Sequence, residues 1–147
     1  MRAIYIDDPI KWEEDFSFHI EVKVRFSETD MYGHLNNTVP FIYFEEARIE
    51  YFKSIGYNEW ASEESEKIIV VADLQCDFLK QVYFDETLKI YVKAAHVGTS
   101  SVDIHYLVKN AHDQTVFTGR GAMVQINKST GKGTPWTEKE KLILHGK

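Results

Sequence analysis

Alternating apolar and polar residues predict a chain built mostly of β-strands around one long helix. In residues 17–26, Ile20, Val22 and Val24 alternate with charged neighbours, which is the period of a half-buried strand. Four later segments also show strand patterns: residues 68–79, 87–97, 100–110 and 115–127. The first of these begins Ile-Ile-Val-Val, which predicts burial on both faces. Short connections join the last three, so they predict an antiparallel meander.

One helical pattern, in residues 41–55, separates the first strand from the others. Apolar residues cover most of its circumference and leave a narrow charged stripe. The Asn-Asn-Thr sequence at residues 36–38 can cap its N-terminus, Pro40 suits its first turn and Gly56 can end it. Such a helix is buried only if the sheet curls around it. We therefore predict an α+β fold in which a five-stranded curled antiparallel sheet wraps around one long central helix.

The ends of the chain show weaker patterns. Residues 1–16 carry Asp-Asp-Pro and Glu-Glu-Asp clusters, which predict an irregular or short-strand lead-in. Residues 128–144 predict a glycine-rich loop and a short helix capped by Thr137 or Thr134. The outer side of the sheet keeps apolar residues that need a cover, and this surface predicts a partner subunit. These residues are Tyr91, Val97, Leu107 and Phe117.

Length and charge narrow the class of protein. The 147 residues fit a single domain, residues 1–147, with a core of its own. No apolar run approaches the roughly 20 residues that cross a bilayer, and acidic residues stand where a signal peptide would be apolar. We therefore expect a cytoplasmic protein that does not bind a membrane. The net charge of −6, without a basic stripe, argues against nucleic-acid binding.

The cysteine and histidine content indicates no metal site. The single cysteine, Cys76, excludes an intrachain disulfide and a thiolate metal site. In a strand it shares the parity of Ile68, Leu74 and Phe78, so we expect a buried small hydrophobic residue rather than a nucleophile. The six histidines show no HxxxH spacing. We predict neither a metal nor a cofactor.

Polar side chains concentrate in the sequence DMYGHLNN, residues 30–37, directly before the helix. A carboxylate such as that of Asp30 can act as a general base or as a nucleophile. The N–H groups of a helix start can receive the negative charge of an oxyanion, and residues 37–41 offer these except at Pro40. His34 can orient the carboxylate or polarise a carbonyl. The structural alternative is an Asx turn at Asp30, a loop hydrogen bond at His34, and two Asn caps.

The order of strand, polar loop, central helix and strand meander, together with D-x-x-G-H-x-N-N, closely resembles the hot-dog fold acyl-CoA thioesterases of the 4-hydroxybenzoyl-CoA thioesterase type. The resemblance covers roughly residues 18–144 and is sharpest at residues 25–37 and 43–52. It implies thioester hydrolysis with Asp30 as the catalytic carboxylate. It also implies a homodimer or homotetramer, with the acyl group and pantetheine arm at the subunit interface. Pro40 stands where relatives typically have a tyrosine.

Within this resemblance, the catalytic candidates are Asp30, His34 and Asn37. Residues around them are candidates for substrate binding, namely Tyr32, Gly33, Asn36, Thr38 and Phe41. The turn residues Gly98, Ser100 and Ser101 can line the pantetheine path. Arg120 and Lys128, with Lys80 and Lys132, are candidates for binding the phosphates of coenzyme A. Glu45 and Glu46 are expected to form solvated or interface ion pairs rather than to act as the catalytic carboxylate.

We therefore predict an acyl-CoA thioesterase that hydrolyses an aliphatic or aromatic acyl thioester to free acid and coenzyme A. Two alternatives stay open on the sequence. The substrate can instead be carried by an acyl carrier protein, or the domain can bind acyl groups without turnover. A dehydratase of the same fold fits less well, because those enzymes pair a histidine and a carboxylate from different elements.

Overall fold

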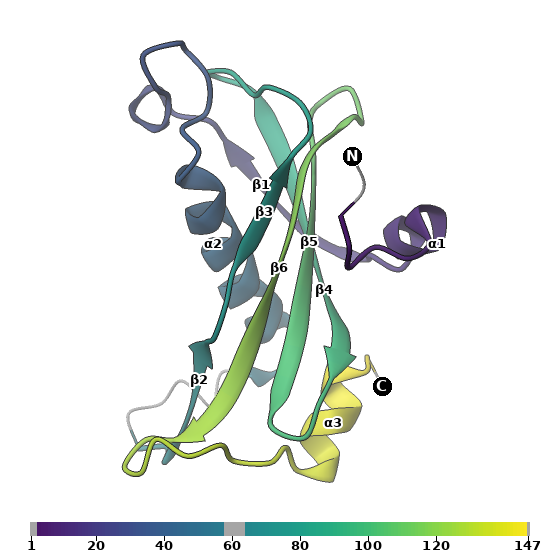
Figure 1. The fold of residues 1–147 in the computed structure, drawn as a ribbon, viewed down its shortest axis with the longest axis vertical. Coiled ribbons are helices and arrows are strands. Elements are labelled where there is room, and N and C mark those ends of the chain that lie inside the picture. Colours follow the sequence, from purple (N-terminus) through teal and green to yellow (C-terminus); the bar gives the residue numbers. More distant parts are fainter. Residues whose placement is uncertain (1–2, 58–63, 147) are drawn as a thin grey trace.

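A curled antiparallel sheet holds one long helix along its inner face in the computed structural model, which describes residues 3–57 and 64–146 (Figure 1). None of the helices in these two ranges is long and apolar enough to cross a membrane. In chain order the elements are α1 (Pro9–Glu14), β1 (Phe18–Lys23), the 3-10 helix η1 (Phe26–Glu28), α2 (Val39–Ser54), β2 (Lys67–Val71), β3 (Gln75–Phe78), β4 (Thr87–Val97), β5 (Ser101–Lys109), β6 (Thr115–Asn127) and α3 (Glu138–Leu144).

The sheet has the order β1-β4-β5-β6, and both β2 and β3 pair with the far side of β6. All of these pairs are antiparallel. The strand predicted for residues 68–79 is thus two strands in one position of the sheet. The chain leaves the ladder between them, where the Asp73 carboxylate accepts a hydrogen bond from Ala122 N at 2.8 Å.

This interruption changes which side chains face inward. Val70 pairs with Val124, whereas Cys76 pairs with Gly119, and these two β6 residues lie on opposite faces because they are five positions apart. The parity predicted that Cys76 shares a face with Ile68 and Val70. The pairing places it on the opposite face, so this prediction is wrong. Cys76 is only partly buried, but it packs against the core cluster, so its prediction as a buried small residue is confirmed in part. Val71 is exposed, so burial of this strand on both faces is wrong.

Helix α2 packs on the inner face through aromatic contacts. The Phe44 ring stacks on Tyr106 of β5 at a centroid distance of 4.2 Å and also contacts Phe117 of β6. Arg48 donates from Nη1 to the Tyr106 hydroxyl at 3.0 Å, which satisfies a buried polar pair. The predicted hot-dog fold is confirmed. Phe117 and Val97, predicted on the outer face, belong instead to the inner side, where both pack with the core.

The sheet covers only one side of α2. Ile42 and Ile49 are 58% and 48% exposed on the opposite side, next to the exposed Glu45 and Glu46. The prediction of a helix buried nearly all round is therefore wrong for this chain alone. A half-open sheet reaches only part of a helix surface, and the remainder is free to meet another molecule.

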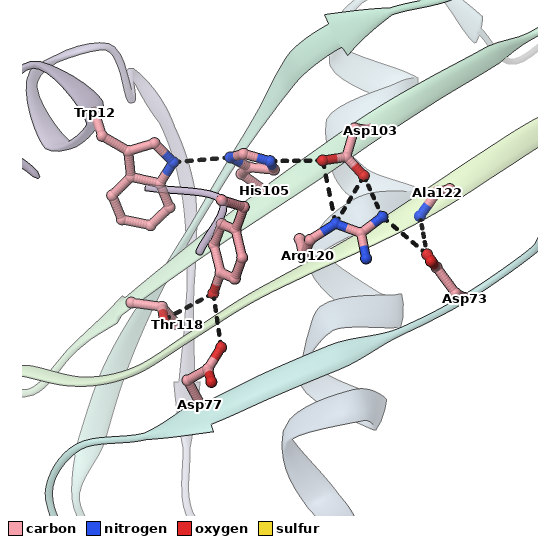
Figure 2. A network of polar contacts seen from close by, with 9 residues as sticks. Trp12, Asp73, Asp77, Asp103, His105, Thr118, Arg120 and Ala122 are labelled. Atoms are coloured by element: carbon pink, nitrogen blue, oxygen red, sulfur yellow. Dashed lines mark hydrogen bonds and ion pairs between the residues drawn. The ribbon is translucent and has the colours of Figure 1, made fainter. Parts of the chain in front are cut away.

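The N-terminal segment, predicted as an irregular lead-in, contains a helix and packs on the outer face of the sheet. Asp8 caps α1 by accepting from Lys11 N. Trp12 donates from Nε1 to His105 Nδ1 at 2.8 Å, and His105 Nε2 lies 2.7 Å from Asp103 (Figure 2). Because an indole N–H can only donate, His105 carries its proton on Nε2. The chain thus covers part of the outer face that was predicted to need a partner.

Arg120 completes this polar network. Its guanidinium bonds Asp103 at 2.5–3.2 Å and Asp73 at 2.9 Å (Figure 2). Burial raises the pKa of Asp103, but hydrogen bonds from His105 and Arg120 outweigh it and hold the pKa at about 2. Tyr5 adds hydrogen bonds to Thr118 and Asp77 at 2.9 and 3.2 Å. Beneath this segment Leu107 is buried.

The C-terminal helix α3 is capped by Thr137, one of the two predicted residues. Its hydroxyl accepts from Glu140 N at 3.1 Å, and the Glu140 carboxylate accepts from Thr137 N at 2.8 Å. This reciprocal pair is a capping box, and it satisfies two N–H groups that the helix itself leaves open.

We predict that Gly119→Ala lowers the free energy of unfolding by about 1–3 kcal/mol, the cost typical of overpacking a core. A Cβ atom at this position would lie 2.6 Å from Phe44 Cζ and 2.7 Å from the Gln75 carbonyl. Denaturant unfolding followed by tryptophan fluorescence measures the loss.

The matched control is Gly133→Ala. Its Cβ would first meet the Ser100 hydroxyl at 3.1 Å, which can rotate away, so we expect a change below about 0.5 kcal/mol. Equal losses in the two variants would contradict crowding between α2 and β6 as the cause.

Candidate active site

Residues 29–35 form a small hairpin that places Asp30 and His34 side by side. Thr29 and Leu35 form a β-bridge, and Asp30 N donates to the His34 carbonyl at 2.8 Å. The turn closes with a bond from Gly33 N to the Asp30 carbonyl at 3.0 Å. Gly33 has φ +79°, a conformation that favours glycine. The glycine of the motif is therefore needed for the turn that joins the two candidate catalytic residues.

The Asp30 carboxylate is held by one of its two oxygens. Oδ1 accepts from Tyr32 N at 2.8 Å and from His34 N at 3.2 Å, so Asp30 does form the Asx turn of the structural alternative. Within residues 3–57 and 64–146, Oδ2 has no hydrogen-bond donor. The carboxylate is thus fixed in direction and keeps one oxygen available.

A cavity of about 370 Å³ lies beside this hairpin. Its polar lining comes from Asp30, His34 and Asn37, the three residues predicted as catalytic, and from Lys80 and Gln81. The apolar lining is Leu35, Phe78, Leu79, Val82 and Phe117. The structure therefore joins the loop motif to an apolar wall built from β3, the connection after it, and β6.

Residues 78–82 were not predicted as part of the site, except for Lys80 as a possible phosphate ligand. They comprise the last residue of β3 and the connection after it, and they carry no motif. They reach the cavity because β3 pairs with β6 and brings Phe78 opposite Phe117. Leu35 N donates to the Val82 carbonyl at 2.7 Å, which ties this connection to the hairpin. The Tyr83 ring meets His34 edge-on at 5.2 Å.

The two asparagines of the motif do different things. Asn36 forms an Asx turn ahead of the helix, because its Oδ1 accepts from Thr38 N at 3.0 Å and from the Thr38 hydroxyl at 2.9 Å. The N-cap residue of α2 is Thr38, which makes no side-chain cap hydrogen bond, so neither asparagine caps the helix as predicted. The Asn36 carbonyl accepts from Val39 N at 3.0 Å. Asn37 is exposed and lines the cavity. Two of the N–H groups predicted to receive an oxyanion, those of Thr38 and Val39, are therefore already occupied.

The other predicted binding residues are spread over the fold. Tyr32 is exposed beside His34, and Phe41 is partly buried against Phe44. Gly98, Ser100 and Ser101 lie at the turn between β4 and β5, at the opposite end of the sheet from the hairpin (Figure 1). A single chain therefore does not bring this turn to the cavity.

The basic candidates also separate. Arg120 lies on the outer face, where hydrogen bonds to Asp103 raise its pKa despite partial burial. Lys128 and Lys132 are exposed in the loop after β6. Lys80 lines the cavity that contains Asp30. Of these four predicted cations, Lys80 is the one that the fold places near the candidate chemistry.

Comparison with known proteins identifies the family. The model of the thioesterase-like superfamily matches residues 24–141, which contain the hairpin, α2 and the whole meander. The chain belongs to the thioesterase-like superfamily. The uncharacterized protein YsmA of Bacillus subtilis is 51% identical over 96% of this chain and 95% of its own length. The chloroplastic acyl-acyl carrier protein thioesterase ATL3 of Arabidopsis thaliana is 31% identical over 75% of this chain and 59% of its own length.

Solved structures of thioesterases share the fold. A Thermus thermophilus thioesterase complexed with coenzyme A and Zn superposes with a TM-score of 0.76, at 29% identity over 90% of this chain and 95% of that one. A putative thioesterase from Pseudomonas aeruginosa gives a TM-score of 0.76, at 27% identity over 86% and 97%. The resemblance predicted from the sequence is thus confirmed for this superfamily. Among the described residues of this chain, no group of three or more His, Cys, Asp or Glu is placed to hold a metal ion.

We predict that Cys76 of the folded protein reacts with iodoacetamide at pH 8 roughly 1,000-fold more slowly than free cysteine. Burial, and then the charge of Asp77, raise the pKa of the Cys76 thiol to about 12, so very little of the reactive thiolate is present. Mass spectrometry of timed samples measures the labelling, with protein unfolded in guanidinium as the control. Labelling at the unfolded rate would contradict the partly buried position of Cys76 against the core.

Proposed function

We propose that this protein hydrolyses acyl-CoA thioesters, with Asp30 as general base or nucleophile. The observation that carries the proposal is one cavity that Asp30, His34 and Asn37 share with a mostly apolar lining. A thioesterase needs a group to deliver water or attack the carbonyl, a group to meet the oxyanion, and an apolar space for the acyl chain. This cavity offers all three.

In the general-base route, Asp30 Oδ2 takes a proton from a water molecule while the oxygen of that water bonds to the thioester carbon. The tetrahedral intermediate collapses, the C–S bond breaks, and the thiolate leaves to receive a proton from the medium. In the nucleophilic route, Asp30 itself bonds to the carbon, the thiolate leaves, and water then hydrolyses the anhydride. Both routes use an oxygen that has no donor among the described residues.

The developing oxyanion accepts hydrogen bonds from His34 and Asn37. The Asn37 N–H donates no hydrogen bond to any described residue, and Asn37 lines the cavity. His34 can donate from its ring to the carbonyl oxygen and so polarise it. His34 then acts as an electrophile, and the thiol leaving group needs no separate acid.

One solved relative supports coenzyme A as the carrier. The Thermus thermophilus thioesterase, at 29% identity, was solved with coenzyme A, and Lys80 provides a cation at the cavity for an anionic part of the substrate. A second candidate is an acyl carrier protein as the carrier, because the Arabidopsis relative acts on such thioesters by name. Pantetheine is common to both carriers, so the same cavity serves either one.

We also propose that the protein forms a homodimer or homotetramer. The exposed side of α2, with Ile42 and Ile49, continues into an apolar cavity of about 570 Å³ next to β2. The outer edge of β2 and β3 forms no ladder with another described strand. An open strand edge beside exposed apolar residues of a helix is typical of an interface.

We predict that Asp30→Asn lowers kcat by roughly 100-fold or more, the scale of a lost catalytic base. An Asn side-chain oxygen can still accept the two bonds that Asp30 Oδ1 accepts from Tyr32 N and His34 N, so the turn is kept while the carboxylate chemistry is removed. A thiol-release assay across aliphatic and aromatic acyl-CoA substrates measures it. Turnover by the variant at the wild-type rate would exclude Asp30.

The matched control is Asp85→Asn. Asp85 is an exposed residue at φ +72°, ion-paired with Lys23 at the same end of the fold, and Asn tolerates this backbone conformation. We expect its kcat to stay within about twofold of wild type, as for an exposed ion pair of little energetic weight.

Matched acyl-CoA and acyl carrier protein substrates then decide between carriers by kcat/KM. Failure of the wild type on every thioester would favour an acyl-binding domain without turnover.

We predict that Ile49→Glu shifts the wild-type oligomer towards monomer in sedimentation velocity, because it places a charge in an apolar interface. Lys139→Gln changes the net charge by the same amount on the exposed side of α3 and is expected to leave the assembly unchanged. A wild-type protein that sediments as a clean monomer would contradict the proposed assembly.

A further inference from the structure

The hairpin that carries Asp30 is joined to α2 by a buried pair, Glu28 and Tyr43. Tyr43 donates from its hydroxyl to Glu28 Oε1 at 2.8 Å, and the two residues are 3% and 8% exposed. Tyr43 lies on α2, one turn after the helix start, and Glu28 ends η1 directly before the hairpin. Neither residue lines the cavity that contains Asp30.

Glu28 holds the hairpin through its main chain as well. Its carbonyl accepts from Asn36 N at 2.8 Å, which is the outermost rung of the hairpin, beyond the bridge between Thr29 and Leu35. The same residue therefore bonds the base of the hairpin with its carbonyl and the helix with its carboxylate. The distance between Asp30 and the start of α2 depends on both bonds.

A buried carboxylate in this place is costly unless it is fully hydrogen-bonded. Burial by itself raises the pKa of Glu28. Hydrogen bonds from Arg25 N, the Tyr43 hydroxyl and the Arg25 guanidinium lower the pKa by more than burial raises it, so the net pKa lies below its ordinary value. Glu28 is thus an anion at neutral pH, and its bond to Tyr43 is charge-assisted. Such bonds are shorter and more directional than neutral ones.

We propose that Glu28 and Tyr43 are positioning residues that set Asp30 against Asn37 and the α2 N-terminus. The inference rests on the proposed function, since it assigns a catalytic purpose to that spacing. Asn37 lies directly before α2, whereas Asp30 lies on the hairpin. A thioester carbon must lie within reach of Asp30 while its oxygen meets Asn37, and errors near 1 Å in such geometry cost roughly 100-fold in rate.

The test is Tyr43→Phe, which keeps the buried ring and removes the hydroxyl. We expect kcat to fall roughly 10- to 100-fold, the effect typical of removing the support of a catalytic group, with KM changed less than about threefold because the cavity lining is untouched. Glu28→Gln keeps an acceptor for Tyr43 and removes the charge, so it should fall between wild type and Tyr43→Phe. The double variant should lose no more than Tyr43→Phe alone.

Tyr51→Phe is the matched control for a structural role. Tyr51 is also a buried tyrosine of α2, and its hydroxyl bonds the Ala94 backbone, two turns further from the hairpin. Tyr51→Phe should lose stability comparably and keep kcat. An equal fall of kcat in both tyrosine variants would overturn the positioning role, and so would an unchanged kcat in Tyr43→Phe.

Amide hydrogen exchange separates this proposal from the proposed function. In Tyr43→Phe the amides of Asp30, Gly33 and Asn36, which bond within the hairpin, should exchange roughly tenfold faster, and Tyr51→Phe should leave them unchanged. If the wild type hydrolyses no thioester and the hairpin still loosens, the proposed function fails and the Glu28–Tyr43 linkage stands. If the hairpin amides keep their wild-type rates, the linkage itself is overturned.

Discussion

The close contact between α2 and β6 at Gly119 is the constraint on which the rest of the structure depends. Phe44 lies over this glycine and packs between Tyr106 and Phe117. With the helix held this near to the sheet, its N-terminal end stands opposite Phe117 and the end of β3. The cavity beside Asp30 is the space that remains between these elements and the hairpin. Packing at the middle of the helix therefore defines the site at its start.

The two faces of the sheet carry different kinds of side chain. The inner face is apolar and carries the helix, while the outer face carries the network of Trp12, His105, Asp103 and Arg120 (Figure 2). In this network each charge meets an opposite charge or a hydrogen bond, as burial requires. The guanidinium of Arg120 is consequently engaged by Asp103 and Asp73 on the outer face, away from the cavity that contains Asp30.

Local patterns predicted much of the fold. The strands at residues 87–97 and 115–127 were predicted with the observed bounds because alternation is a local property of the sequence. The interruption between β2 and β3 was not visible, since apolar residues continue through it and its cause, the bonds of Asp73 to Ala122 and Arg120, joins residues almost 50 positions apart. The docking of α1 escaped prediction for the same reason, because Trp12 meets His105 only after folding.

The candidate site divides in the same way. Asp30, His34 and Asn37 were found because the motif is contiguous, whereas residues 78–82 reach the cavity through the pairing of β3 with β6. The sequence posed structural and chemical roles for Asp30 as alternatives, but a carboxylate has two oxygens. One closes the turn through Tyr32 N and His34 N, and this bonding aims the other. The Asx turn is therefore no argument against catalysis, because a base held by its own turn is already oriented before substrate arrives.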